Sequence, residues 1–120
     1  MGVFRRLASR LAQTDEERLA DEVREWAESV SDTTRIGECE MRTPVRIAGV
    51  VRRMTIRPAE GAGSLEAVIS DGTGEIVAAW TGRDQIPGLG LGTRLVLEGV
   101  CGRDRDGQVR KMVNPKFEFA

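Results

Sequence analysis

The side chains of this chain that can do chemistry are carboxylates, two cysteines and a large set of arginines. There is no His, so acid–base catalysis would depend on carboxylates, Lys or Cys. Cys39 and Cys101 lie far apart in no CxxC spacing, and the lack of His excludes a Cys/His zinc site. We therefore expect a non-enzymatic protein with reduced cysteines, no metal site and no cofactor.

The segment Ser70–Glu75 contains Gly72-Thr73-Gly74, which resembles a phosphate-binding loop. It lacks the Lys and the following helix that such loops need. Asp71 is a conceivable general base, but an Asp before Gly-Thr-Gly is typical of an Asx turn. The Asp-Gly step between two apolar runs therefore predicts a tight β-hairpin and not a catalytic site.

Binding of a single nucleic-acid strand needs cations for the phosphates and flat rings for the bases. As nucleic-acid-binding candidates we take the residues expected around two loops and the last strand, namely Arg46, Arg52, Arg53, Arg57, Trp80, Arg83, Arg103, Arg105, Arg110, Lys111 and Lys116. Asp104 and Asp106 partly cancel the charge of their loop. An ordinary solvated surface explains the same set about as well.

Aromatic side chains are scarce, because the chain has no Tyr, two Trp and three Phe. Trp80 lies near the end of an expected strand, where it can face the core or a groove, and the core is favoured. Stacking contributes about 1–3 kcal/mol per base, so its scarcity predicts weak, salt-sensitive binding dominated by the phosphate backbone.

The elements that must position these residues begin with a helix predicted over residues 14–30. Thr14 and Glu17 form a capping box at its start. Spacings of four, three and four residues place an apolar seam on one face, consisting of Leu19, Val23, Trp26 and Val30. A seam this narrow can cap the end of a barrel, or it can dock a protein partner or a second copy.

Charge divides the chain into an acidic helical extension, residues 1–34, and a mildly basic domain, residues 35–120. Residues 1–32 hold five Arg against eight acids, and the rest holds thirteen Lys and Arg against eleven acids. No segment has the character of a membrane span or a secretory signal. We expect a cytoplasmic protein without membrane contact, since the short segment of Phe4, Leu7 and Leu11 is a weak anchor.

From residue 45 onward, apolar runs and turn signals predict five strands. Gly49 predicts a bend in the first, so that this strand serves both halves of a curled sheet. Parity places Leu65, Ala67 and Ile69 on the core face of the hairpin. We expect an all-β fold, a five-stranded OB-fold barrel with an N-terminal α-helical extension, ahead of an SH3-like barrel. The expected strands cover residues 45–56, 64–70, 75–82, 93–101 and 108–119.

Residues 45–119 resemble the OB-fold domains of the anti-codon-like nucleic-acid-binding group, and are similar to the wedge domain of RecG-type DNA helicases. The likeness is carried by four segments, Val45–Val51, Ser70–Gly74, Leu91–Gly99 and Asn114–Glu118. Small stand-alone actinobacterial OB-fold proteins look similar too. The resemblance implies a barrel that holds single-stranded DNA or RNA in a sequence-tolerant manner, with a role in DNA repair or recombination. The resemblance does not extend to the helical extension, and the sequence shows no helicase motor.

The alternative function is a protein–protein interaction or adaptor module. The outer face of the hairpin would offer Val68, Val77 and Ala79 to an apolar partner, and the seam of the acidic helix would contact a partner or a second copy. The negative charge of that helix opposes nucleic acid on its side of the molecule.

Overall fold

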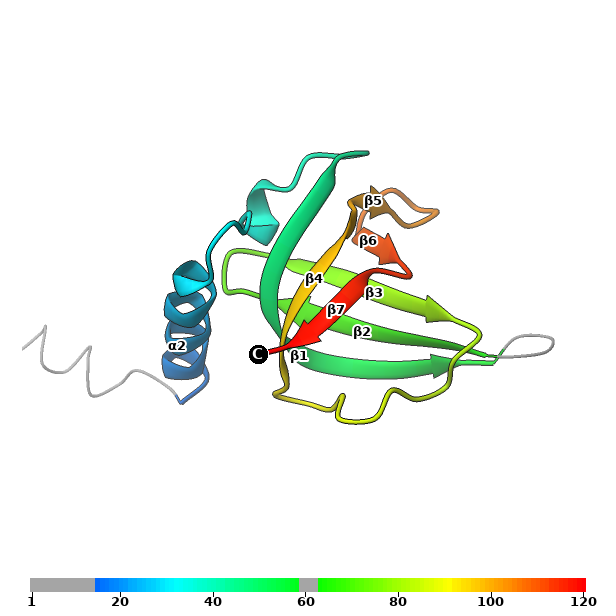
Figure 1. Cartoon of the computed structure of the whole chain (residues 1–120), viewed down its shortest axis with the longest axis horizontal. Coiled ribbons are helices and arrows are strands. Elements are labelled where there is room, and N and C mark those ends of the chain that lie inside the picture. The colour runs from blue at the N-terminus through cyan, green and yellow to red at the C-terminus, as the bar shows by residue number, and fades with distance from the viewer. Residues whose placement is uncertain (1–14, 59–62) are drawn as a thin grey trace, which may run out of the picture.

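The computed structural model describes residues 15–58 and 63–120, which form one curved sheet with a helix at one end (Figure 1). The sheet has seven strands in the order β5-β6-β3-β2-β1-β4-β7. The strands are β1 (Pro44–Arg57), β2 (Ser64–Ser70), β3 (Glu75–Thr81), β4 (Arg94–Val100), β5 (Gly102–Arg103), β6 (Arg110–Val113) and β7 (Lys116–Phe119).

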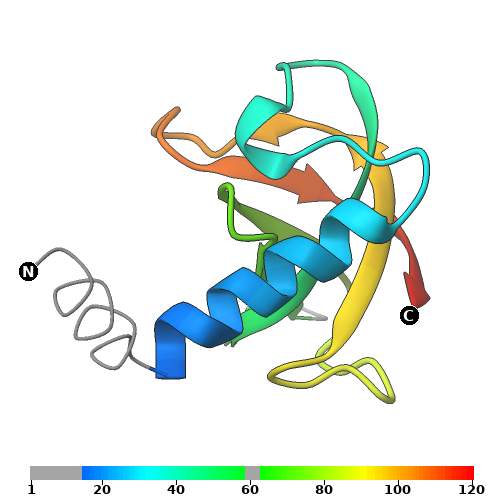
Figure 2. The same ribbon diagram turned by 90° about the vertical axis from the view of Figure 1, so that its left-hand side faces the viewer.

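Helix α2 (Asp15–Ser29) has an acidic first turn, which suits the positive end of the helix dipole. It confirms the predicted helix, although the predicted capping residue Thr14 lies outside the described residues. Val23 and Ala27 are buried, and Ala27 packs with Ala48 of β1. Figure 2 shows α2 crossing in front of the curved sheet. Among the described residues, no helix is long and apolar enough to cross a membrane.

The apolar seam of α2 is mostly covered by the sheet of the same chain. Val23 is 8% exposed, and Trp26 and Val30 pack against the cluster around Ala27. Arg94 of β4 lies over the Trp26 ring, 5.0 Å from its centroid. Leu19 is the seam residue that stays open, at 53% exposure. The seam therefore anchors α2 to the sheet through the buried Val23, with Trp26 and Val30 half-buried beside it.

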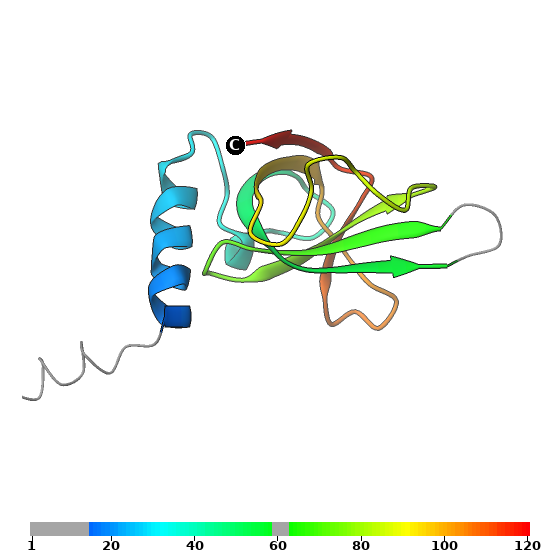
Figure 3. The same cartoon turned by 90° about the horizontal axis from the view of Figure 1, so that it is seen from below.

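Strand β1 belongs to both halves of the sheet. Residues 44–50 pair with β4 and residues 50–57 pair with β2, so Val50 has a partner on each side. The pairing with β2 shifts by one residue between Val51 and Arg53, which marks a β-bulge. Beyond this bend β1, β2 and β3 run away from α2 (Figure 3). The predicted role of the first strand is confirmed.

Gly49 lies just before the bulge, at the position where the sequence predicted the bend. A Cβ there would lie 2.6 Å from Cγ2 of Ile69 and 2.9 Å from the carbonyl oxygen of Ser70. Any larger residue would push β1 away from β2 at the point where β1 changes partner.

Strands β2 and β3 form the predicted hairpin, with Ser70 opposite Glu75 across the turn. The parity prediction is also confirmed, since one face is at most 4% exposed and consists of Leu65, Ala67, Ile69, Ile76, Ala78 and Trp80. The opposite face carries Glu66, Val68 and Val77, which are partly open to solvent. Ala79, which was also expected on the open outer face, is buried at 2% exposure.

The predicted last strand, residues 108–119, is interrupted. β6 ends at Val113 and β7 begins at Lys116, because Asn114 has a left-handed φ of 50° and Pro115 has no N–H. β6 runs parallel to β3, whereas β7 runs antiparallel to β4, and the short β5 pairs with β6. The structure therefore has seven strands where five were predicted, because the last predicted strand is divided in two and the short β5 is added, and the strand order runs from β5 to β7 without closing.

Candidate nucleic-acid interface

A groove of about 530 Å³ lies over the outer face of β2 and β3. The end of β1 bounds it on one side, and the loop between β5 and β6 bounds it on the other. Its lining residues, which define the groove below, are Arg57, Glu66, Val77, Asp104, Arg105, Asp106, Val109 and Lys111. The structure thus brings together three of the predicted cations, Arg57, Arg105 and Lys111.

Strand register explains how cations come to flank this face. One row of paired residues crosses four strands, from Arg53 through Val68 and Val77 to Lys111. Neighbouring strands are about 4.8 Å apart, so the row spans about 14 Å. Both ends of the row are cationic, and its middle is a pair of half-buried valines. Along this row the outer face is therefore a narrow apolar strip between two cations.

A carboxylate occupies the floor of the groove. The Glu66 side chain is 14% exposed, and its two oxygens contact cations from different walls. Oε2 accepts a hydrogen bond from Nε of Arg57 at 2.9 Å, and Oε1 lies 3.4 Å from Nζ of Lys111. The sequence placed Glu66 on the outer face but did not predict these ion pairs, because Lys111 is 45 residues away.

The loop between β5 and β6 is held by its own hydrogen bonds. Asp104 donates its N–H to the Val109 carbonyl at 2.9 Å, and its Oδ1 accepts from the Val109 N–H at 3.4 Å. Arg103 donates from Nη1 to the Gly107 carbonyl at 2.9 Å. Asp104 and Arg103 are thus engaged within the loop, while Arg105 is exposed beside the groove.

The groove is electrically balanced. Three cations, Arg57, Arg105 and Lys111, line it together with three carboxylates. A balanced lining creates little long-range attraction for a polyanion, so a polyanion here would depend on short-range ion pairs with individual cations.

The other predicted cations do not line the groove. Arg46 pairs with Glu98 of β4 at 3.0 Å, and Arg110 donates to the Gly37 carbonyl at 3.0 Å. Arg52 lines a separate hollow beside α2, which also contains Leu19. The remaining candidates outside the groove lining are Arg53, Arg83, Arg103 and Lys116.

Trp80 is a core residue. It is 4% exposed, its Nε1 donates to the Pro115 carbonyl at 3.2 Å, and its ring packs edge-on against Phe117. The favoured core orientation is confirmed, and we remove Trp80 from the nucleic-acid-binding candidates because a buried ring offers no face to a base. The residues described as lining the groove include no aromatic ring.

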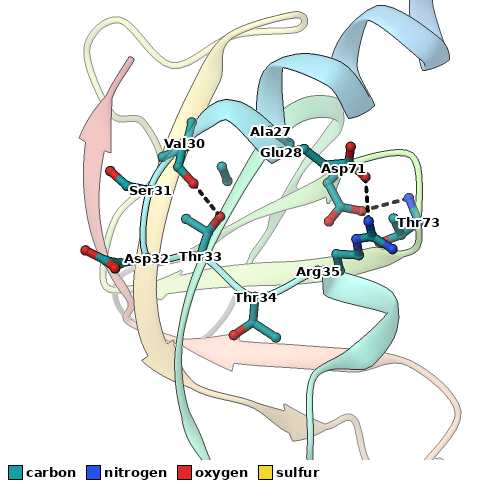
Figure 4. A pocket seen from close by; sticks show the side chains of 11 residues that line it. Ala27, Glu28, Val30, Ser31, Asp32, Thr33, Thr34, Arg35, Asp71 and Thr73 are labelled. Carbon is teal, nitrogen blue, oxygen red and sulfur yellow. Dashed lines mark hydrogen bonds and ion pairs between the residues drawn. The ribbon is translucent and has the colours of Figure 1, made fainter.

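A second hollow, of about 390 Å³, lies between the end of α2, the β2–β3 turn and the connector from α2 to β1, residues 30–43 (Figure 4). Asp71, which lines it, is 3% exposed and hydrogen-bonded at both oxygens. Oδ1 accepts from the N–H and the hydroxyl of Thr73, at 2.8 and 2.6 Å, which confirms the predicted Asx turn. Oδ2 accepts from the Ile36 N–H at 2.8 Å. Asp71 therefore links the 3-10 turn η1 (Ile36–Glu38) to the hairpin at the wall of this hollow.

Cys39 and Cys101 lie in the same core cluster and carry free thiols. Burial above all, and then the neighbouring Cys101, raises the pKa of Cys39 to about 11. A thiol with that pKa is protonated at neutral pH and is a poor nucleophile. Within the described part of the chain, no three His, Cys, Asp or Glu residues lie close enough to hold a metal ion.

No protein-family model matches this chain, and no curated protein matches it. The features of the chain that bear on function are therefore the groove, its charges and the strand pairing that positions them.

Proposed function

We propose that this chain is an OB-fold protein that binds single-stranded DNA or RNA in the groove, without catalysis and with little sequence preference. The observation that carries the proposal is the position of the groove. It lies over β2 and β3, between the end of β1 and the loop that precedes β6. OB-folds hold oligonucleotides on the same face, bordered by the first and last of their long loops.

Strand pairing supports the OB-fold assignment. β1 pairs with β2 and β4, β3 pairs with β2 and β6, and β4 pairs with β1 and β7. We interpret β6 and β7 as two halves of one C-terminal strand, broken at Asn114 and Pro115. Each of five strands then has two neighbours, which is the pairing of a closed barrel.

The chemistry of the lining favours the nucleic-acid backbone over the bases. Arg57, Arg105 and Lys111 can each pair with a phosphate, whereas the apolar part consists of Val77 and Val109. Contacts to phosphate and sugar carry no sequence information. A role in DNA repair or recombination is supported by the resemblance to helicase wedge domains alone.

The proposal is tested by fluorescence anisotropy, in which the protein is titrated into a labelled oligothymidylate of 12 nucleotides at low and moderate salt. Replacing Arg57, Arg105 and Lys111 together by Gln should lower the association constant at least tenfold, because the groove then carries three carboxylates and no cation. Each phosphate neutralised on a single strand contributes about −0.7 to the slope of log K against log salt. The slope should therefore move from about −2 toward zero.

A matched control replaces Arg18, Arg24 and Arg42 by Gln, which removes the same charge from exposed sites that do not line the groove. This variant should bind within threefold of the wild type. Absence of wild-type binding at low salt, or equal losses in the two triple variants, would exclude the groove as the binding site.

A further inference from the structure

Glu66 is the one groove residue that contacts both opposing walls. Arg57 comes from the end of β1 and Lys111 from β6, and the Glu66 carboxylate lies between them. The Glu66 side chain is 14% exposed, Lys111 29% and Arg57 69%. Ion pairs that are partly withdrawn from water are screened less by salt than exposed pairs, so salt screens the Lys111 contact less than the Arg57 contact. The Arg57 contact is the shorter of the two, at 2.9 Å against 3.4 Å.

The contact has the chemistry of a bound phosphate. A phosphodiester offers cations two non-bridging oxygens that share one negative charge, and Glu66 likewise offers Oε1 to Lys111 and Oε2 to Arg57. Charge-assisted hydrogen bonds of this kind are the contacts by which Arg and Lys hold phosphate. Glu66 therefore engages both cations, through Nε of Arg57 and Nζ of Lys111, that a nucleic-acid backbone in the groove would use.

We propose that Glu66 is an internal competitor of phosphate, which holds Arg57 and Lys111 across the groove and releases them when a phosphodiester binds. This inference rests on the proposed function, because it describes how the groove takes its ligand. Glu66 thereby lowers the affinity for every polyanion and sets the salt concentration at which binding is lost. A neutral residue at this position gives the groove one more net positive charge.

A direct role for Glu66 in reading bases makes the opposite prediction. A carboxylate can accept hydrogen bonds from the amino group of cytosine. In that case neutralising Glu66 would weaken binding, and it would do so for oligocytidylate more than for oligothymidylate. The sign of the affinity change therefore separates competition with phosphate from base recognition.

The test compares wild type, Glu66→Gln and Glu98→Gln by anisotropy with labelled 12-residue oligothymidylate and oligocytidylate. Glu98 is a matched control, because it pairs with Arg46 at 3.0 Å on the same sheet but does not line the groove. We expect Glu66→Gln to bind both probes at least fivefold more tightly at low salt, because Arg57 and Lys111 are then free of the carboxylate. Glu98→Gln should stay within twofold of the wild type.

Equal or weaker binding by Glu66→Gln, while the wild type binds, would overturn the competition model and leave the proposed function standing. Equal gains in Glu66→Gln and Glu98→Gln would overturn it as well, since they would reflect net charge alone. If neither the wild type nor Glu66→Gln binds at low salt, the proposed function fails and the competition model fails with it. Thermal melts followed by circular dichroism check folding, and Glu66→Thr, a strand-compatible residue, replaces Glu66→Gln if that variant is unfolded.

Discussion

At the residue scale, Asp71 connects two segments that lie far apart in the sequence. Its carboxylate accepts hydrogen bonds from the Thr73 N–H and hydroxyl, the Gly74 N–H and the Ile36 N–H. Ile36 is fully buried, so its amide has no easy access to water if this acceptor is lost. One side chain therefore fixes both the hairpin turn and the connector that leads from α2 into the sheet.

Asp71→Ala should lower the free energy of unfolding by about 3 kcal/mol, because several donors lose a charged acceptor and at least one of them is buried. Urea denaturation followed by circular dichroism measures the change. Asp106→Ala, which alters an exposed carboxylate in the groove loop, should stay within about 0.5 kcal/mol of wild type. Equal losses in the two variants would contradict the role assigned to Asp71.

Cys39 makes stability depend on pH in the alkaline range. Burial raises its pKa from 9.0 to about 11 in the folded chain, so between these values the unfolded chain releases a proton that the folded chain retains. The free energy of unfolding should therefore fall as pH rises from about 9 to about 11, by on the order of 2 kcal/mol. Urea titrations at several pH values should show a flatter profile for Cys39→Ala; an unchanged slope would refute this assignment.

At this scale the sequence predicted individual roles better than contacts. The Asx turn of Asp71 follows from its neighbours, but its bond to Ile36 depends on a contact 35 residues away. The same holds for Glu66. Strand parity predicts its outward position, but its ion pair with Lys111 cannot be predicted from parity. Proximity of Cys39 and Cys101 likewise arises only when the connector folds back against the end of β4.

At the element scale, β1 depends on close approach at Gly49. Gly49→Ala should destabilise the fold by about 1–3 kcal/mol, since the added Cβ would overlap Ile69 and the Ser70 carbonyl. Gly90→Ala is the control, because the nearest atom to its added Cβ, the Thr93 hydroxyl, is 4.0 Å away. Thermal or urea unfolding of both variants measures the difference in stability. A Gly49→Ala protein as stable as Gly90→Ala would show that β1 can shift without cost.

Most elements were predictable because their patterns are local. The periodic apolar seam specified α2, and the Asp-Gly-Thr-Gly turn between alternating runs specified the hairpin. The break between β6 and β7 was missed, although the Asn114-Pro115 step carried a signal, since Asn-Pro is a common turn dipeptide. Strand β5 has two residues, too few for any periodic pattern.

At the scale of the whole molecule, the groove depends on how the sheet curls. β1 places Arg57 on one side of the outer face. β6 places Lys111 on the other side, because β6 pairs with β3. The sequence identified these cations without showing which of them meet, because register between distant strands is not a local property. It showed that Asp104 and Asp106 offset the charge of their loop, but not that Glu66 joins them in the groove.

The central claim is that nucleic acid binds in the groove, and an NMR titration tests it most directly. Amide shifts of the ¹⁵N-labelled protein are followed while unlabelled oligothymidylate is added at low salt. The account predicts that perturbations are concentrated at Arg57, along residues 64–68 and 75–79, and in the loop and strand from 103 to 111. Perturbations centred on α2 or on β7, or none at all, would contradict it.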